Sequence, residues 1–167
     1  KTSNLRQLIN NSGKKLCQCI RCREIKSVYS PSDIIKLFRQ NYLASGGQEI
    51  FLSFESPNRQ KLYALLRLRI PKNLSDNILP VLQNAALIRE LHTYGQLVPL
   101  KTNNCKLKTI PAAQHIGLGK QLMLEAEKIV KTETPFQKIA VISGIGVREY
   151  YRKLGYKLKD EYMVKNV

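Results

Sequence analysis

The sequence contains no apolar run near the roughly 18 residues that a membrane-spanning helix requires, and no signal-peptide pattern at its start. It lacks the marks of a membrane or secreted protein, and we expect no membrane partner. It begins with Lys1 instead of methionine, which is compatible with a segment cut from a longer polypeptide. No internal repeat or low-complexity stretch is visible.

Acidic residues are scarce, because 12 of them stand against 28 lysines and arginines and leave a net charge of +16 at pH 7. A field of this size attracts polyanions, and nucleic acid is the first candidate. The excess is uneven: residues 1–30 hold seven basic side chains and one acidic one. A lysine-rich surface without any nucleic-acid role is the alternative explanation.

The length and the apolar share of 43% fit one globular domain. We expect a basic N-terminal segment at residues 1–30 and a single domain at residues 31–167. Ser30 and Pro31 are typical of a helix start, and the Ser-Gly-Gly run from Ser45 is typical of a helix end. The elements predicted in chain order are a helix at 30–45, strands at 48–55 and 61–70, a loop at 72–84, a strand at 85–98 that is interrupted or bulged near Gly95, a helix from 117, a strand at 138–143, a short helix at 146–155 and a last strand at 156–165.

Two glycines, Gly117 and Gly119, lie where the long helix pattern begins. The first amides of a helix have no partners within it, and the helix dipole is positive at this end, so the loop suits a phosphate or pyrophosphate. It is not a P-loop, since Gln121 follows Gly119 and Lys120, and it has no third glycine at Rossmann spacing. A glycine loop that merely starts a helix is the alternative.

Three cysteines, Cys17, Cys19 and Cys22, lie within six residues. This density is typical of a structural zinc site, whose fourth ligand would be Cys105, with His115 as the substitute. Disulfides are the other possibility, but they are typical of secreted chains.

The motif Gln114-x-x-Gly117-x-Gly119, followed by a strand and "EYYRKLGY", resembles the acetyl-CoA site of the GNAT acetyltransferase superfamily. The blocks "CIRCREI", "RELHTYGQLVP", "EAEKI", "KIAVISGIGVREYYRKLGY" and "YMVK" are similar to the acetyltransferase domain of the Elongator catalytic-subunit family, which modifies the wobble uridine of transfer RNA. The resemblance implies an α+β GNAT fold. Its central sheet is mixed, mostly antiparallel and flanked by helices, splayed strands form the acetyl-CoA cleft, and a small zinc-bound segment precedes it.

Full-length members of that family carry an N-terminal radical S-adenosylmethionine domain, and nothing of it occurs in this sequence. The resemblance therefore implies three kinds of partner: transfer RNA, such a domain, and other Elongator subunits. It implies a cytoplasmic location, and a nuclear one as well in a eukaryote. The cofactors expected are acetyl-CoA and a structural zinc ion.

The resemblance also implies that the loop amides hold the pyrophosphate and that main-chain groups of the splayed strands bind the pantetheine arm. The residues expected at the coenzyme are Leu91, His92, Gln114, His115, Ile116, Gly117, Leu118, Gly119, Lys120, Ser143, Tyr150 and Tyr151.

Breaking a thioester leaves a sulfur that needs a proton, and a phenol near it can act as general acid. The resemblance implies that Tyr150 and Tyr151 are the candidates for this phenol, and we expect one of the two to pack in the core. Glu90 and His92 lie two residues apart on the first splayed strand and so share a face, where either could act as a base. Alternatively, Glu90 pairs with a neighbouring arginine.

The basic residues are expected to form one RNA-binding surface around the mouth of the cleft. They are Arg21, Arg23, Lys26, Lys101, Lys106, Lys108, Arg148, Arg152 and Lys153. The function expected is acetyl transfer to the wobble uridine of transfer RNA, with RNA-stimulated hydrolysis of acetyl-CoA. The alternatives are acetylation of lysine in a protein such as histone or tubulin, and a transfer-RNA-binding module with a vestigial coenzyme site.

Overall fold

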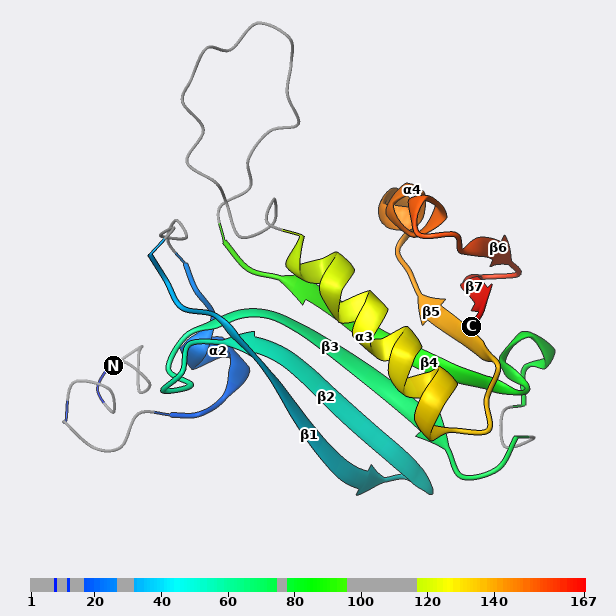
Figure 1. Cartoon of the computed structure of the whole chain (residues 1–167), viewed down its shortest axis with the longest axis horizontal. Coiled ribbons are helices and arrows are strands. Elements are labelled where there is room, and N and C mark those ends of the chain that lie inside the picture. The colour runs from blue at the N-terminus through cyan, green and yellow to red at the C-terminus, as the bar shows by residue number, and fades with distance from the viewer. Residues whose placement is uncertain (1–7, 9–11, 13–16, 27–31, 75–77, 96–116) are drawn as a thin grey trace, which may run out of the picture.

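The chain forms a seven-stranded sheet with one long helix across a face (Figure 1), in a computed structural model that describes residues 8, 12, 17–26, 32–74, 78–95 and 117–167. The strand order is β1-β2-β3-β4-β5-β7-β6, and every neighbouring pair is antiparallel except β4 and β5, which are parallel. The predicted α+β class with a mixed, mostly antiparallel sheet is confirmed. The elements are α2 (Ile20–Arg23), β1 (Lys36–Ala44), β2 (Gly47–Glu55), β3 (Leu62–Pro71), η1 (Pro80–Leu82), β4 (Ala85–Thr93), α3 (Leu118–Glu133), β5 (Lys138–Ile142), η3 (Ile145–Val147), α4 (Arg148–Lys153), β6 (Lys157–Lys159) and β7 (Tyr162–Asn166).

The helix predicted at residues 30–45 is wrong, because β1 occupies this part of the sequence. β1 pairs with β2 residue by residue, and Ser45 and Gly46 form the connecting turn with φ of 47° and 69°. Two positive φ values in a row are typical of the tight turns of β-hairpins. As an edge strand, β1 leaves most of its side chains exposed, so its apolar spacing carried no information about a buried face.

The hairpin of β2 and β3 is confirmed, but the bulge of β4 lies earlier than predicted. Arg67 is opposite Glu90, and the next residue of β3, Leu68, is opposite Ile88. Arg89 is therefore the extra residue, and it reverses the face to which the rest of β4 points. Gly95, where we predicted the bulge, lies beyond the end of the strand.

The helix predicted from Gly117 is confirmed as α3. Its predicted apolar positions are all buried and pack on one face of the sheet, here called the front face (Figure 1). These side chains are Leu118, Leu122, Met123, Ala126, Ile129 and Val130. The opposite, back face carries a smaller apolar cluster under η1 and another beside α2.

The C-terminal part holds β5 and the short helix α4, as predicted, but the last strand is a hairpin of two. Asp160 takes a φ of 51° between β6 and β7 and reverses the chain there. None of the described helices has the length and apolarity to span a bilayer. The predicted domain boundary at residue 30 falls outside the described residues and stays a prediction.

Candidate active site

The two parallel strands, β4 and β5, pair over only a short stretch. Residues 85–88 of β4 pair with residues 138–141 of β5, and residues 89–93 of β4 have no strand partner on that side among the described residues. The predicted splay of these strands stays a prediction, and the short ladder agrees with it. Unpaired backbone groups of this kind suit the amides of an extended ligand.

The N-terminus of α3 lies beside the end of β4. Gly117 adopts a left-handed conformation with φ 76°, and no side chain of the described residues caps the helix. The first backbone hydrogen bond of the helix runs from the N–H of Gln121 to the carbonyl of Gly117. The amides of Leu118, Gly119 and Lys120 therefore have no acceptor within the helix, and the dipole adds positive charge there.

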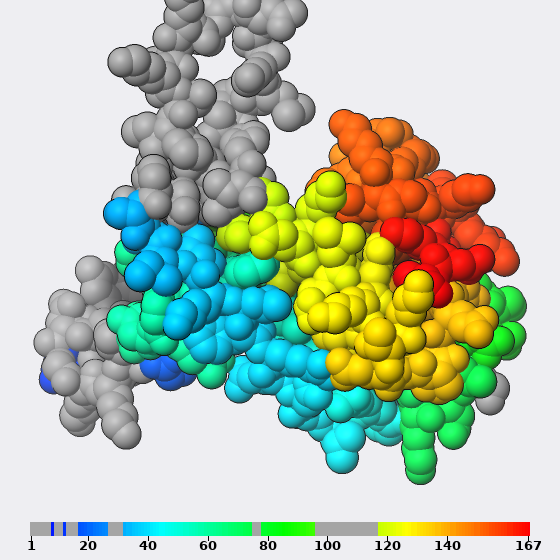
Figure 2. Space-filling view, in the orientation of Figure 1, coloured from blue at the N-terminus to red at the C-terminus, as the bar shows by residue number. Residues whose placement is uncertain are grey.

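Three elements meet at Gly119. A Cβ atom at this position would lie 3.1 Å from the hydroxyl of Tyr150 on α4 and 3.5 Å from the methyl group of Thr93 at the end of β4. Figure 2 shows the start of α3 and α4 close together on one side of the molecule. The phenol thus stands directly over the helix turn that presents the free amides. Thr93 is missing from the predicted site, although its place at the end of the splayed strand could have signalled it.

The two tandem tyrosines have different surroundings. Tyr151 is 5% exposed and packs its ring edge-on against Tyr156, whose hydroxyl donates to Glu127 at 3.0 Å. Tyr150 is 37% exposed, with its ring 5.2 Å from that of Tyr151. Burial, and then the neighbouring Tyr151, raises the pKa of Tyr150 to about 12, which keeps the phenol protonated at neutral pH. Tyr150 is therefore the better placed of the two to donate a proton into the cleft.

Ser143 lies directly after β5, the second of these two parallel strands. Its hydroxyl oxygen is shielded from solvent and has no hydrogen-bond partner among the described residues. Leaving a buried hydroxyl unbonded costs about 1–3 kcal/mol, which a bound ligand would relieve. Free amides, a glycine that leaves room and this hydroxyl together fit acetyl-CoA. The remaining predicted coenzyme residues lie outside the described residues: Gln114, His115 and Ile116.

Glu90 and His92 point away from Tyr150. Glu90 lies opposite Arg67 with their side chains 3.1 Å apart, and His92 lies opposite Leu65, with its ring 4.4 Å from that of Tyr94. Because Leu65 belongs to a back-face cluster, both residues lie on the back face. Leu91 points to the front face, where it packs against the main core.

The cysteine cluster lies around α2. The sulfur atoms of Cys17, Cys19 and Cys22 are all within 4.8 Å of one another, close enough for one metal ion. Hydrogen bonding to Cys19, burial and the nearby Cys17 raise the pKa of Cys22, an effect that a bound cation reverses. The proposed fourth ligand Cys105 and its substitute His115 lie outside the described residues.

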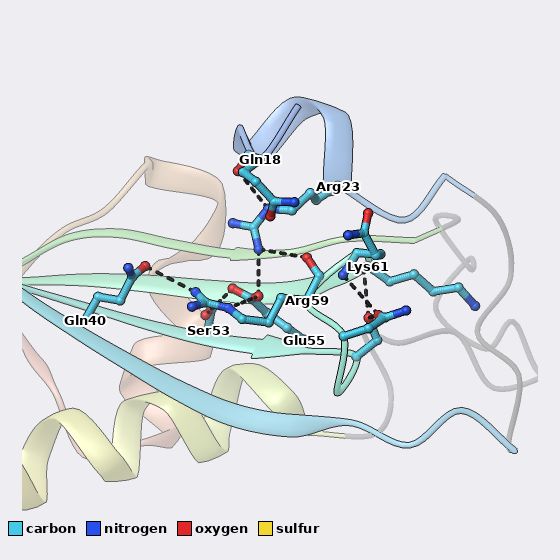
Figure 3. A network of polar contacts seen from close by, with 10 residues as sticks. Gln18, Arg23, Gln40, Ser53, Glu55, Arg59 and Lys61 are labelled. Carbon is cyan, nitrogen blue, oxygen red and sulfur yellow. Dashed lines mark hydrogen bonds and ion pairs between the residues drawn. The ribbon is translucent and has the colours of Figure 1, made fainter. Parts of the chain in front are cut away.

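Arg23 fixes this segment to the sheet (Figure 3). Its guanidinium is 8% exposed and donates to the carboxylate of Glu55 at 2.6 Å and to the carbonyl of Gln18 at 2.9 Å. Glu55, at the end of β2, is fully buried and also accepts from Arg59 at 3.0 Å and from Ser53 at 2.7 Å. We call these four side chains, Arg23, Ser53, Glu55 and Arg59, the α2 anchor. The side chain of Arg23, which we predicted to contact RNA, is therefore bound within the α2 anchor and does not face solvent.

The predicted RNA contacts on α4 are partly neutralised. Arg148 lies 3.6 Å from Glu161, and Arg152 pairs with Glu149. Three predicted contacts are exposed and have no ion pair within the described part of the chain: Arg21, Lys26 and Lys153. Three others lie outside the described residues: Lys101, Lys106 and Lys108.

Comparison with known proteins gives a consistent set of relatives, although no family model matches the chain. The chain is 45% identical over its whole length to the tRNA uridine(34) acetyltransferase of Methanocaldococcus infernus, and 42% identical over 98% of its length to Elongator complex protein 3 of Saccharomyces cerevisiae. These matches cover 32% and 30% of the relatives, so the chain spans about a third of their length. The chain also resembles the solved structure of the archaeal Elp3 from Methanocaldococcus infernus with N-terminal residues 1–46 deleted, with a TM-score of 0.73 and 42% sequence identity. The match covers 96% of this chain and 38% of the Elp3 chain.

Proposed function

We propose, from the premise that the chain belongs to the family of the tRNA uridine(34) acetyltransferases and Elongator complex protein 3, that it is the acetyl-CoA-binding part of such an enzyme. Its substrate would be transfer RNA, and the acetyl group would serve carboxymethyl modification of the wobble uridine. The observation that carries the proposal is the position of the Tyr150 hydroxyl over Gly119, at an uncapped helix N-terminus beside two splayed strands.

Acetyl-CoA would supply an activated acetyl group as a thioester. The amides at the start of α3 would bind its phosphates, and the backbone of residues 89–93 its pantetheine arm. In hydrolysis, water would add to the acetyl carbon and give up its protons to solvent, the carbon–sulfur bond would break, and the departing sulfur would take a proton. Tyr150 would donate that proton or stabilise the sulfur by a hydrogen bond, and its raised pKa, which keeps the phenol protonated at neutral pH, supports this role.

The test of this function is hydrolysis of acetyl-CoA by the chain alone, with transfer RNA, and with a lysine peptide. We expect transfer RNA to stimulate hydrolysis. Transfer of the acetyl group to the peptide would favour protein lysine acetylation instead. Binding of transfer RNA without any binding of acetyl-CoA would favour an RNA-binding module with a vestigial site.

Tyr150→Phe and Tyr151→Phe form a matched pair, because each removes one hydroxyl from the same helix. We expect Tyr150→Phe to lower hydrolysis by about 10²-fold, the size typical of a missing general acid, with acetyl-CoA affinity retained. Tyr151→Phe should keep most activity, because this phenol packs in the core. The reverse order would assign the chemistry to Tyr151.

We also propose that Cys17, Cys19 and Cys22 bind one structural zinc ion, with Cys105 as fourth ligand. The close approach of the three sulfur atoms supports this ligand set. The zinc would organise the N-terminal segment. A radical S-adenosylmethionine domain and other Elongator subunits are the proposed protein partners, and the cytoplasm is the proposed location.

A further inference from the structure

The back face of the sheet carries two groups of cations that differ in their partners. On β3 and β4, Arg69 and Arg89 both bind the buried carboxylate of Glu49, at 3.1 and 2.9 Å, and Arg67 lies beside Glu90. These arginines are therefore largely neutralised. The lysines of β5 and β6 on this face have no such partner among the described residues.

Lys138, Lys157 and Lys159, here called the back-face lysines, share one surface. In the paired strands, Lys157 lies opposite Val164 and Lys159 opposite Tyr162. Val164 and Tyr162 pack in the apolar cluster under η1, so these lysines point to the back face. On β5, Lys138 alternates with the buried Ile139 of the front-face core and so points to the same side.

No carboxylate of the described residues pairs with any of the back-face lysines. Lys157 and Lys159 are exposed, and Lys138 is half-buried. Partial burial, and then the charge of Lys159, holds the pKa of Lys138 below its usual value. Like charges held close together without counter-ions repel one another, and an anion bound between them would relieve that repulsion.

The surface leads to the cleft. Lys159 and Ile142 lie opposite the same residue of β7, Tyr162, and Ile142 directly precedes Ser143 at the mouth of the cleft. At about 3.4 Å for each residue, the row from Lys138 to Ile142 extends roughly 14 Å away from that mouth. A phosphate-bearing strand lying along this row would have one end at the cleft.

We propose that the back-face lysines bind successive phosphates of the RNA substrate and so form an RNA contact on the face opposite α3. This inference rests on the proposed function and adds to it a second RNA-binding surface, separate from the arginines of α4. Lysines that bind phosphate act by releasing counter-ions, so each bound phosphate adds to the salt dependence of binding.

The test measures binding of transfer RNA to the full chain by fluorescence anisotropy across a salt series. The variant is Lys157→Gln with Lys159→Gln, and the control is Lys128→Gln with Lys131→Gln, which removes the same charge from exposed positions on α3. We expect the back-face variant to bind transfer RNA about tenfold more weakly, with a log–log salt slope that is smaller by about 0.7–0.9 for each phosphate that the variant no longer neutralises. The control should change both quantities much less. Acetyl-CoA binding should be equal in all three proteins, which also shows that they are folded.

Equal decreases in RNA affinity in the two double variants would overturn the inference, because they would indicate net charge instead of a site. Wild-type RNA affinity in the back-face variant would also overturn the inference. If transfer RNA still stimulates hydrolysis in that variant, the proposed function is unaffected. If the wild-type chain binds anionic phospholipid vesicles and the back-face variant does not, while RNA binding is unchanged, the ligand of these lysines is a lipid surface and not RNA. A wild-type chain that binds acetyl-CoA but no transfer RNA would refute the proposed substrate as well.

Discussion

Replacing Glu55 by glutamine should destabilise the protein more than replacing either arginine of the α2 anchor. The Glu55 carboxylate is fully buried and is the acceptor that Arg23, Arg59 and Ser53 share. The substitution leaves the buried guanidinium of Arg23 without a counter-charge. Breaking a buried ion pair in this way costs about 3–5 kcal/mol of unfolding free energy.

The two arginines should rank below Glu55 in a definite order. Arg23→Met removes a buried charge, but Glu55 keeps its bonds to Arg59 and Ser53, so we expect a decrease of about 2–3 kcal/mol in the unfolding free energy. Arg59 is 37% exposed, and solvent screens its pairing, so Arg59→Met should cost about 1 kcal/mol or less.

Urea unfolding followed by circular dichroism measures these three free energies on one scale. Hydrogen exchange of the amide of Ile25, which bonds to the carbonyl of Leu62, reports separately whether the α2 segment detaches. If Arg59→Met costs as much as Glu55→Gln, or if Glu55→Gln costs less than about 1 kcal/mol, the buried pair does not hold the segment in place.

The remaining predictions concern the site, the metal and pH. Gly119→Ala places a methyl group 3.1 Å from the Tyr150 hydroxyl, and acetyl-CoA hydrolysis should fall by about tenfold, since a misplacement of about 1 Å can cost about 10²-fold; unchanged kinetics would show that the phenol moves freely. Chelation of zinc, or Cys22→Ser, should destabilise the N-terminal segment and weaken RNA binding, and metal analysis of protein purified without chelator should find about one zinc per chain; a zinc-free protein contradicts the site. Burial raises the pKa of Glu55, but bonds from Arg59 and Ser53 and the charge of Arg23 outweigh it and bring the pKa below 4.5. Because the folded pKa is the lower one, the carboxylate stabilises the fold fully above about pH 4.5 and loses this effect as the pH falls through the folded value; an NMR titration of Glu55 with an unshifted midpoint would contradict this.

Local patterns predicted those elements whose buried side follows from neighbouring residues. The β2–β3 hairpin has two apolar runs around a turn of polar residues, and α3 has one continuous apolar stripe. β1 has neither signal, because an edge strand is exposed on most sides, and Ile34 and Phe38 happened to fall at helical spacing. The ion pairs of Glu49 could not be predicted, since its partners lie on other strands.

The sequence identified the glycine loop and the tandem tyrosines but not which tyrosine faces the cleft. Tyr150 and Tyr151 are adjacent on one helix, and only packing against Tyr156 distinguishes them. The face of the sheet to which Glu90 points could not be predicted either, because the bulge at Arg89 reverses the alternation of side chains along β4. A single inserted residue decides which face a catalytic candidate points to.

The short parallel ladder between β4 and β5 has a consequence for the order of folding. β1 to β4 follow one another as antiparallel neighbours, so each pairing closes a short loop. The pairing of β4 with β5 must wait for the intervening chain and α3, and it closes a much longer loop at a higher entropic cost. We therefore expect β1 to β4 to form first and β5, β7 and β6 to dock last. The acetyl-CoA cleft would then be the last part of the molecule to assemble, and a ligand bound there would slow unfolding more than it speeds folding.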